Sequence, residues 1–260
     1  MTESWRLLSF APHDAYTNMA IDEAISRFRS QDKVPNTLRF YRWKPSAVSI
    51  GYFQLMDKEV NLEACRELGI DVIRRITGGG AVYHDYMGEI TYSIIAKGES
   101  ANIPSGIDES YGVICKGIII GLKRLGIEAV FAPINDLLVN SKKISGNAQT
   151  RRWGIVLQHG TILVDSDIRT MFTVLKVSQA KIDDKMIKSV EERVTTINRE
   201  MGRKIDFLEI VEALRTGFTE ALDMDLHPAE LTKEEEELAR QLVLMKYKTE
   251  KWNLMRPDQY

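Results

Sequence analysis

The 260-residue sequence predicts an α/β (α+β) fold in which mixed β-sheets are flanked by helices and the C-terminal part is helical. Up to Asp165, strand-like runs are interleaved with helical segments, whereas the pattern after Asp165 is mainly helical. The chain shows no internal repeat, low-complexity tract or obvious linker. We therefore expect a single domain over residues 1–260.

The expected strands are short runs of apolar, β-branched and aromatic residues. They lie at 6–10, 38–42, 47–52, 72–75, 90–95, 129–131, 137–139 and 155–164. The expected helices lie near 17–28, 60–68, 108–125, 167–174, 182–192, 205–222 and 232–247.

Two of these helices carry further signals. Helical spacing in the segment near 108–125 predicts an apolar face in the core, made of Tyr111, Ile114, Ile118, Leu122 and Leu125. Residues 232–235 spell a capping box for the last long helix. We expect the glutamate run 234–237 to be a solvated first turn favoured by the helix dipole.

Composition excludes several classes of protein. With 44% apolar and 28% charged residues the chain is typical of a globular protein, and its net charge of −2 gives no support to nucleic-acid binding. No apolar run approaches the ~20 residues of a membrane span, and the N-terminus lacks a signal-peptide pattern. We expect a cytoplasmic protein with neither nucleic-acid nor membrane partners. The two cysteines, Cys65 and Cys115, fall in expected helices, and the four histidines lack metal-ligand spacing, so no protein-held metal is predicted.

The first motif is a run of three glycines, Gly78, Gly79 and Gly80, preceded by Arg74 and Arg75. Without Cβ atoms the backbone can turn through positive φ and lay its N–H groups against an oxyanion. Arginine binds phosphate or carboxylate through two parallel hydrogen bonds. A tight turn between two strands is the alternative interpretation. The spacing matches neither a P-loop nor a G-x-G-x-x-G loop.

The second motif is a lysine pair, Lys142 and Lys143, between an alternating strand pattern and a small-residue turn at 145–148. A lysine pair at a strand end is usually solvated surface, but nearby Asn135, Asp136 and His159 favour a site. Successive side chains of a strand point to opposite faces, so only one lysine of the pair can face that site.

Together these motifs resemble the lipoate–protein ligase A family within the biotin/lipoate ligase superfamily. The blocks that carry the resemblance are 74–85, 135–136, 143–148 and 158–163, with flanking agreement at 18–23, 38–43, 49–54 and 246–253. They follow one another in the family's order over nearly the whole chain. The resemblance implies a biotin/lipoate ligase-like catalytic domain.

The resemblance also implies a reaction. Such enzymes couple lipoate to ATP, with Mg²⁺, to form lipoyl-AMP and pyrophosphate, and then pass the lipoyl group to a lysine of a carrier domain. The implied acceptors are apo lipoyl domains of 2-oxoacid dehydrogenase E2 subunits, the glycine cleavage H protein or similar carriers. We therefore expect a lipoate–protein ligase.

The family's site maps onto this sequence residue by residue. Lys143 matches the lysine that lies between the carboxylate and the α-phosphate, Arg75 is expected to hold the phosphate, and Asn135 and Asp136 are expected to contact the nucleotide or its metal. The other expected binding residues are Gly78, Gly79, Gly80, Ala81, Val82, Tyr83, His84, Ser145, Gly146, Ala148 and His159. Of these, His84 and His159 are assigned to the pocket walls.

Longer ligases carry an additional C-terminal domain that assists adenylate formation, and this chain ends soon after Asn253. The resemblance therefore implies one of two cases. Either a separate small accessory protein supplies that function, or the short form is self-sufficient.

Two alternatives stay open. Octanoyltransferases of the superfamily move an acyl group from acyl carrier protein without ATP, through a cysteine thioester. Their ligase-like versions carry that cysteine just upstream of the lysine block, where residues 128–136 have none, although a distant cysteine can still fold into the site. A non-catalytic lipoyl-binding homologue is the other alternative, but it is expected to have lost at least one of Arg75, the glycines, Asp136 or Lys143. The G-R-G-R-x-G loop of biotin ligases is absent.

Overall fold

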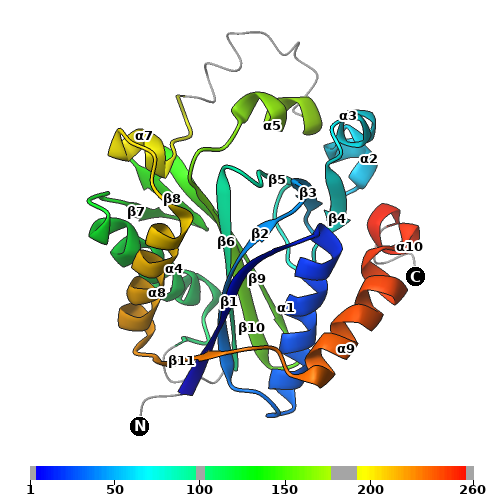
Figure 1. Ribbon diagram of the computed structural model, residues 1–260, viewed down its shortest axis with the longest axis horizontal. Helices are drawn as coiled ribbons and strands as arrows, with labels where there is room; N and C mark the ends of the chain where they lie inside the picture. Colours follow the sequence, from blue (N-terminus) through cyan, green and yellow to red (C-terminus); the bar gives the residue numbers. More distant parts are fainter. Residues whose placement is uncertain (1–3, 98–102, 177–191, 256–260) are drawn as a thin grey trace.

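A computed structural model describes residues 4–97, 103–176 and 192–255. Its centre is an eight-stranded mixed sheet with the strand order β11-β1-β2-β6-β10-β9-β8-β7 (Figure 1). A three-stranded sheet, β4-β3-β5, lies beside it. The strand bounds are β1 (Ser4–His13), β2 (Asn36–Trp43), β3 (Ala47–Ile50), β4 (Asp71–Arg74), β5 (Val82–His84), β6 (Glu89–Lys97), β7 (Val130–Ala132), β8 (Asp136–Val139), β9 (Lys142–Arg152), β10 (Ile155–Leu163) and β11 (Asp225–Ala229).

Helices cover both faces of the large sheet, α4 and α8 on one and α1 and α9 on the other (Figure 1). The period-2 alternation of the strands explains this arrangement: in β6, Ile94 packs into the α4/α8 core and Ile95 into the α1/α9 core. The helix bounds are α1 (Ala15–Ser30), α2 (Met56–Glu59), α3 (Leu62–Glu67), α4 (Ile107–Arg124), α5 (Ile168–Val174), α7 (Ile197–Met201), α8 (Phe207–Leu222), α9 (Lys233–Leu242), the π-helix η1 (Val243–Tyr247) and α10 (Glu250–Leu254).

The mixed α/β architecture confirms the predicted fold class. In α4, the predicted core residues Ile114, Ile118 and Leu122 are all fully buried. The expected helix near 182–192 lies almost entirely outside the described residues. None of the helices in the described part of the chain has the length and apolar character that a membrane crossing requires.

The capping box at the start of α9 is confirmed, because Thr232 and Glu235 each bond the other's backbone N–H. The prediction of a solvated glutamate run is wrong at Glu235, which is fully buried. Its carboxylate forms an ion pair with Arg6, a buried residue of β1, 229 residues earlier in the chain. The carboxylate therefore also ties α9 to the sheet.

The predicted turn at 145–148 is wrong as well, because these residues lie inside β9 and pair with β10. The reversal occurs earlier, at Asn140 and Ser141, whose φ values of 50° and 65° are left-handed. Two consecutive residues with positive φ suit the twist of a two-residue hairpin. The hairpin therefore places Lys143 and the small residues after it along one continuous strand.

Candidate functional site

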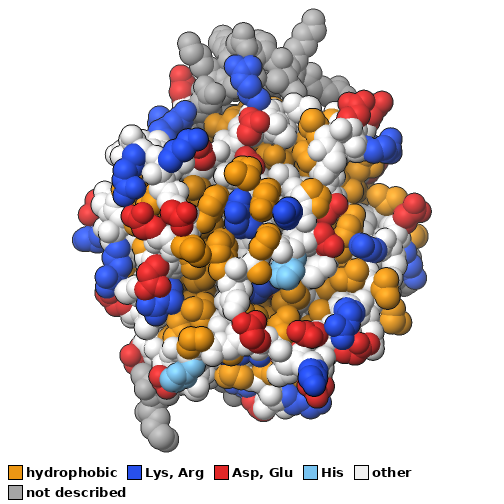
Figure 2. All heavy atoms as spheres, in the orientation of Figure 1, with side chains coloured by type: hydrophobic (Ala, Val, Ile, Leu, Met, Phe, Trp, Pro, Cys, Tyr) orange, Lys and Arg blue, Asp and Glu red, His pale blue; other side chains and the backbone are white. Residues whose placement is uncertain are grey.

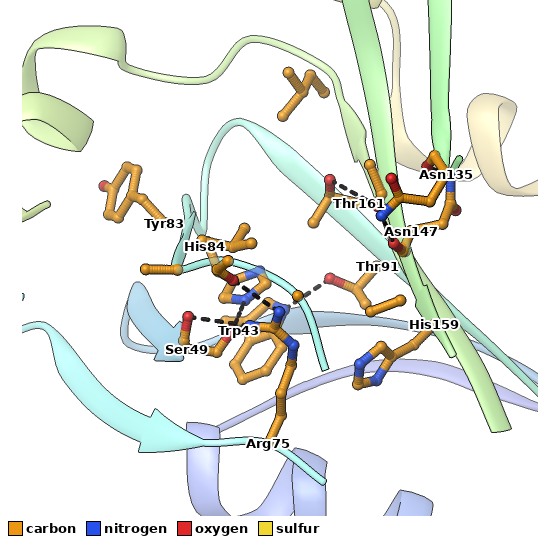
Figure 3. A pocket seen from close by; sticks show the side chains of 18 of the residues that line it. Trp43, Ser49, Arg75, Tyr83, His84, Thr91, Asn135, Asn147, His159 and Thr161 are labelled. Atoms are coloured by element: carbon orange, nitrogen blue, oxygen red, sulfur yellow. Dashed lines mark hydrogen bonds between the residues drawn. The ribbon is translucent and has the colours of Figure 1, made fainter. Parts of the chain in front are cut away.

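A cavity of about 350 Å³ lies among β2, β3, β5, β6, β9 and β10, with residues of the glycine loop and of α5 in its wall. Figure 3 shows its labelled side chains in two groups that face each other across the cavity. The described lining residues are Tyr41, Trp43, Ser49, Arg75, Gly79, Gly80, Ala81, Val82, Tyr83, His84, Thr91, Asn135, Lys143, Gly146, Asn147, Ala148, His159, Gly160, Thr161, Leu163, Met171, Leu175 and Val194. We call this cavity the acyl pocket, after the ligand that the sequence resemblance implies.

Arg75 holds the glycine loop in shape. Its Nη2 donates to the carbonyl oxygens of Gly78 at 2.8 Å and Gly80 at 2.7 Å, so the guanidinium clamps both sides of Gly79, whose φ is 93°. Its Nη1 donates to the carbonyl and hydroxyl of Ser49, and its Nε donates to Thr77. Burial lowers the pKa of Arg75 to about 10. All five N–H groups of the guanidinium thus have protein acceptors, and a phosphate would have to displace one of them.

Arg74 has a different task from its neighbour. It is fully buried, and its guanidinium donates to the carbonyl oxygens of Trp252 at 2.8 Å, Tyr52 at 2.7 Å and Gln54 at 2.6 Å. Its backbone N–H donates to the side chain of Asn253. The interpretation of both arginines as anion binders is therefore wrong for Arg74, which fastens the C-terminal α10 beneath the glycine loop.

Lys143 lies on the solvent side of the acyl pocket. Its Nζ is 2.7 Å from Oδ1 of Asp136, and the two side chains are 41% and 33% exposed. A Cβ at position 146 would lie 2.8 Å from both Cε and Nζ of Lys143, so Gly146 leaves the space that the lysine side chain occupies. Lys142 is not among the described lining residues, as expected from strand alternation.

His84 belongs to a hydrogen-bonded set of side chains in the pocket wall. Its Nε2 lies 2.8 Å from Ser49 Oγ, its Nδ1 lies 2.9 Å from Glu89 Oε1, and its ring stacks on Trp43 at 4.0 Å. Thr91 Oγ1 donates to the same Glu89 oxygen and accepts from the Trp43 indole. Most polar atoms of this set have partners, but Glu89 Oε2 is buried and has no hydrogen-bond partner among the described residues, so the wall presents mainly paired groups and one unsatisfied acceptor.

His159 forms a second such set on β10. Its Nε2 lies 2.7 Å from Thr77 Oγ1, and its Nδ1 lies 3.4 Å from Oδ2 of the buried Asp22. Burial lowers the pKa of His159 below its usual value, so the ring is neutral at pH 7. A neutral imidazole with both nitrogens engaged serves as pocket wall.

The structure gathers most of the residues that the sequence singled out. The expected site residues that line the acyl pocket are Arg75, Gly79, Gly80, Ala81, Val82, Tyr83, His84, Asn135, Lys143, Gly146, Ala148 and His159. Three others are not among the described lining residues: Gly78, Asp136 and Ser145. The carbonyl of Gly78 faces Arg75, Asp136 reaches the site through its ion pair, and Ser145 is buried on the opposite side of β9 from Gly146.

Sequence reasoning missed about half of the wall. The missed residues are Tyr41, Trp43, Ser49, Thr91, Asn147, Gly160, Thr161, Leu163, Met171, Leu175 and Val194. Part of this set follows from strand period: Tyr41 and Trp43 are two apart on β2, and Thr161 and Leu163 continue the face of His159 on β10. These four residues already lie within the blocks 38–43 and 158–163, so strand period alone would have singled them out.

Both cysteines lie away from the acyl pocket. Cys65 in α3 and Cys115 in α4 are buried, and neither is among the described lining residues. Burial raises the pKa of Cys65 to about 11 and that of Cys115 to about 12. Cys115 Sγ lies 3.7 Å from Gln158 Nε2, on the opposite face of β10 from His159. Both thiols are therefore protonated at neutral pH. Cys115 faces the side of β10 that is turned away from the acyl pocket, and Cys65 lies in α3.

Comparison with known proteins gives a consistent family. The family model for the lipoyl protein ligase A/B catalytic domain matches residues 14–219. The octanoyltransferase LipM of Brevibacillus brevis is 38% identical, covering 98% of this chain and 100% of the relative. The octanoyltransferase LipM of Kyrpidia tusciae is 39% identical over 96% of this chain and 98% of the relative.

Solved structures agree on the fold. A bi-partite lipoate protein ligase from Thermoplasma acidophilum, studied with its E2 lipoyl domain, has a TM-score of 0.86 and 35% identity, covering 98% of this chain and 97% of that one. A lipoate–protein ligase A bound with ATP has a TM-score of 0.82 and 34% identity, over 97% and 98% of the two chains.

These relatives correct one expectation. The sequence motifs predicted an ATP-dependent lipoate ligase, but curated relatives that match over nearly their whole length are octanoyltransferases, and this finding overturns that prediction. The chain is an enzyme of the lipoate ligase and acyltransferase group, and it belongs to the lipoyl protein ligase A/B catalytic domain family.

Proposed function

We propose that this chain transfers a medium-chain acyl group, octanoyl or its dithiolane form lipoyl, from a thioester on acyl carrier protein to a lysine of a lipoyl carrier domain. The similarity to octanoyltransferases supports transfer of an octanoyl group, and the similarity to a ligase described with its E2 lipoyl domain supports the acceptor. The observation that carries the proposal is the position of Lys143. Its ammonium group stands on the solvent side of a pocket whose polar wall groups are largely paired with one another.

That arrangement suits an apolar chain with a reactive polar end. The pocket wall combines the apolar residues Trp43, Ala81 and Val82 with the hydrogen-bonded sets around His84 and His159. An acyl chain that enters therefore leaves few polar groups without a hydrogen-bond partner. The thioester carbonyl then remains near Lys143, where solvent and the acceptor lysine can reach it. The ammonium of Lys143 stabilises the negative charge that develops on the carbonyl oxygen.

The transfer balances without a further reactant. The acceptor lysine nitrogen, in its neutral form, attacks the thioester carbonyl carbon and forms the C–N bond. The tetrahedral oxyanion is held by Lys143, and its collapse breaks the C–S bond and releases the carrier thiolate. The nitrogen loses one proton and the thiolate gains one. A thioester is already activated, so the reaction needs neither ATP nor an adenylate, and therefore no accessory protein for adenylation.

The proposal also assigns a direct route. Octanoyltransferases that use a cysteine need a thiolate in the pocket. Here both cysteines are buried elsewhere, with pKa values raised by burial to about 11 and about 12. We infer that the acyl group passes from the carrier thioester to the lysine of the lipoyl domain in one displacement. No covalent acyl-enzyme forms, and Lys143 stabilises the oxyanion of the single tetrahedral intermediate.

The test is a comparison of donors. The purified chain is incubated with an apo lipoyl domain and either octanoyl acyl carrier protein without nucleotide, or octanoate with ATP and Mg²⁺. Intact-mass spectrometry follows the lipoyl domain. The proposal expects acylation in the first mixture, strongly slowed by Lys143→Ala and kept by Lys142→Ala. Product in the ATP mixture alone would overturn it.

A further inference from the structure

A second cavity, of about 550 Å³, lies at the corner of the molecule formed by α7 and the start of α5. We call it the basic groove. Its described lining residues are Asp165, Ser166, Ile168, Thr196, Asn198, Arg199, Gly202, Arg203 and Lys204. Three of these side chains are cationic and one is anionic. Figure 2 shows several blue Lys and Arg side chains over the corner that α7 occupies in Figure 1.

One cation of the basic groove, Arg203, forms an ion pair at the surface. Arg203 Nη2 lies 3.2 Å from Oε1 of Glu209, and both side chains are about half exposed. Arg199 Nη1 donates to the Val194 carbonyl at 3.3 Å. Exposed ion pairs of this kind contribute little free energy. An incoming anion can therefore recruit the Arg203 guanidinium at small cost.

The basic groove adjoins the acyl pocket along two segments of the chain. At the end of β10, Leu163 lines the acyl pocket and Asp165, two residues later, lines the basic groove. The segment after residue 192 repeats this pattern, because Val194 lines the acyl pocket and Thr196 lines the basic groove. The residue between each pair, Val164 or Thr195, is buried.

Backbone hydrogen bonds connect Lys143 to the segment that separates the acyl pocket from the basic groove. The Thr195 N–H donates to the Lys143 carbonyl at 2.9 Å, and the Lys143 N–H donates to the Arg193 carbonyl at 2.7 Å. The basic groove therefore begins one residue beyond the segment that pairs with Lys143. Helix α5 also faces both cavities, with Ile168 in the groove and Met171 in the pocket.

We propose that the basic groove binds the phosphate of the donor's phosphopantetheine arm. This inference rests on the proposed function, in which a thioester is presented at Lys143. Thioester carriers hold their acyl group on a flexible pantetheine chain that ends in a phosphate. With the thioester carbon at Lys143, that chain must leave across the rim, and the basic groove is the adjoining cationic cavity. Arginine is well suited to phosphate through its paired donors.

The experiment measures how much the phosphate of the donor raises kcat/KM. We compare kcat/KM for S-octanoyl-pantetheine, which lacks phosphate, with S-octanoyl-4′-phosphopantetheine. The expected advantage of the phosphorylated donor is about tenfold, the effect of one charge-assisted contact. In the triple variant Arg199→Gln, Arg203→Gln, Lys204→Gln this ratio should fall to near one. A matched variant, Lys58→Gln, Lys123→Gln, Arg240→Gln, removes the same charge from exposed residues that line neither described cavity and should keep the ratio.

A binding measurement separates this inference from the proposed function. Isothermal titration with unacylated 4′-phosphopantetheine and with pantetheine reports the phosphate contact without turnover, and tighter binding of the phosphorylated form should disappear in the groove variant alone. Equal binding of the two forms, or a ratio near one in the unmodified chain, would overturn the inference. Turnover of both thioesters with a ratio near one would still leave the proposed function standing.

Two donors carry this phosphate, acyl carrier protein and coenzyme A. A loss in the groove variant with octanoyl acyl carrier protein identifies the carrier's arm as the ligand. A loss confined to octanoyl-coenzyme A identifies the free cofactor thioester, and either result supports a phosphate site. No loss with either donor would contradict it.

Discussion

The ammonium nitrogen of Lys143 lies 2.7 Å from the Oδ1 atom of Asp136 on the solvent side of the acyl pocket. The side chain of Lys143 is 41% exposed and that of Asp136 is 33% exposed, so the ion pair contributes little to the free energy of folding. The effect of the ion pair is to fix the position of the Lys143 side chain. Asp136 holds the lysine over the pocket, while the exposed fraction leaves the ammonium open to an entering carbonyl.

Replacing Lys143 by alanine should lower kcat by a factor on the order of 10²–10³, because it removes the cation that stabilises the oxyanion. The melting temperature should change little, because the side chain is 41% exposed. Lys142→Ala is the matched control and should cost little. Steady-state transfer assays and thermal denaturation check both points. Equal losses in the two variants would show that the strand faces the other way.

Gly146→Ala should reduce transfer by a factor on the order of 10–100, because a Cβ there would lie 2.8 Å from Cε and Nζ of Lys143 and push the ammonium away. Gly112→Ala in α4 is the control, since a Cβ at that position meets nothing within 4 Å. The kcat of each variant is measured beside its melting temperature. Unchanged kcat in the Gly146 variant would mean that the exact place of Lys143 does not matter.

The double variant Cys65→Ser, Cys115→Ser should retain transfer activity. Burial raises the pKa of these thiols to about 11 and about 12, so both should also resist iodoacetamide at pH 7.5 in the folded chain. Alkylation followed by mass spectrometry and the transfer assay test this. An inactive but folded double variant would require a cysteine intermediate and end the direct route.

The free energy of unfolding should decrease as the pH falls below about 6.5. Burial lowers the pKa of His159, so below the usual histidine value the unfolded chain binds a proton that the folded chain does not. His159→Gln should therefore flatten the stability profile between pH 7 and 5. His13, whose pKa is also lowered by burial, should keep part of the slope. Urea denaturation at each pH checks the profile, and rising stability toward acid would contradict it.

At still lower pH a second group adds to the same trend. Burial raises the pKa of Asp22, but hydrogen bonds and charge from His159 and Arg39 outweigh burial and leave it below the usual value. A carboxyl with a depressed pKa contributes stability above its unfolded pKa, and this contribution is lost as the pH falls through the folded value. The acid limb of the profile should therefore steepen below about pH 4.

The sequence predicted the strands and helices that have strong periodicity, and it failed where tertiary pairing overrides composition. Residues 145–148 are small and polar and read as a turn, yet pairing with β10 keeps them extended. Strand β11 contains His227 and Pro228 and gives no strand signal, but it pairs with β1 at the sheet edge, where proline is tolerated.

The same limit applies to the site. The motifs brought Lys143, the glycine loop and both histidines into one pocket. They did not reveal that adjacent Arg74 and Arg75 point to different partners, because the sequence does not show which strand face is covered by α10. Nor did a glutamate-rich helix start show that Glu235 would pair with Arg6, since that contact depends on the closed fold.

The central claim is that an acyl thioester passes directly to the lipoyl-domain lysine. The most direct measurement is a time course of intact masses for all three proteins, with octanoyl acyl carrier protein as the only acyl source and no nucleotide. The account predicts loss of the octanoyl mass from the carrier and its gain by the lipoyl domain, with no acylated form of this chain at any time point. Acylation that appears only after ATP and free octanoate are added, or an acylated form of this chain that precedes product, would contradict it.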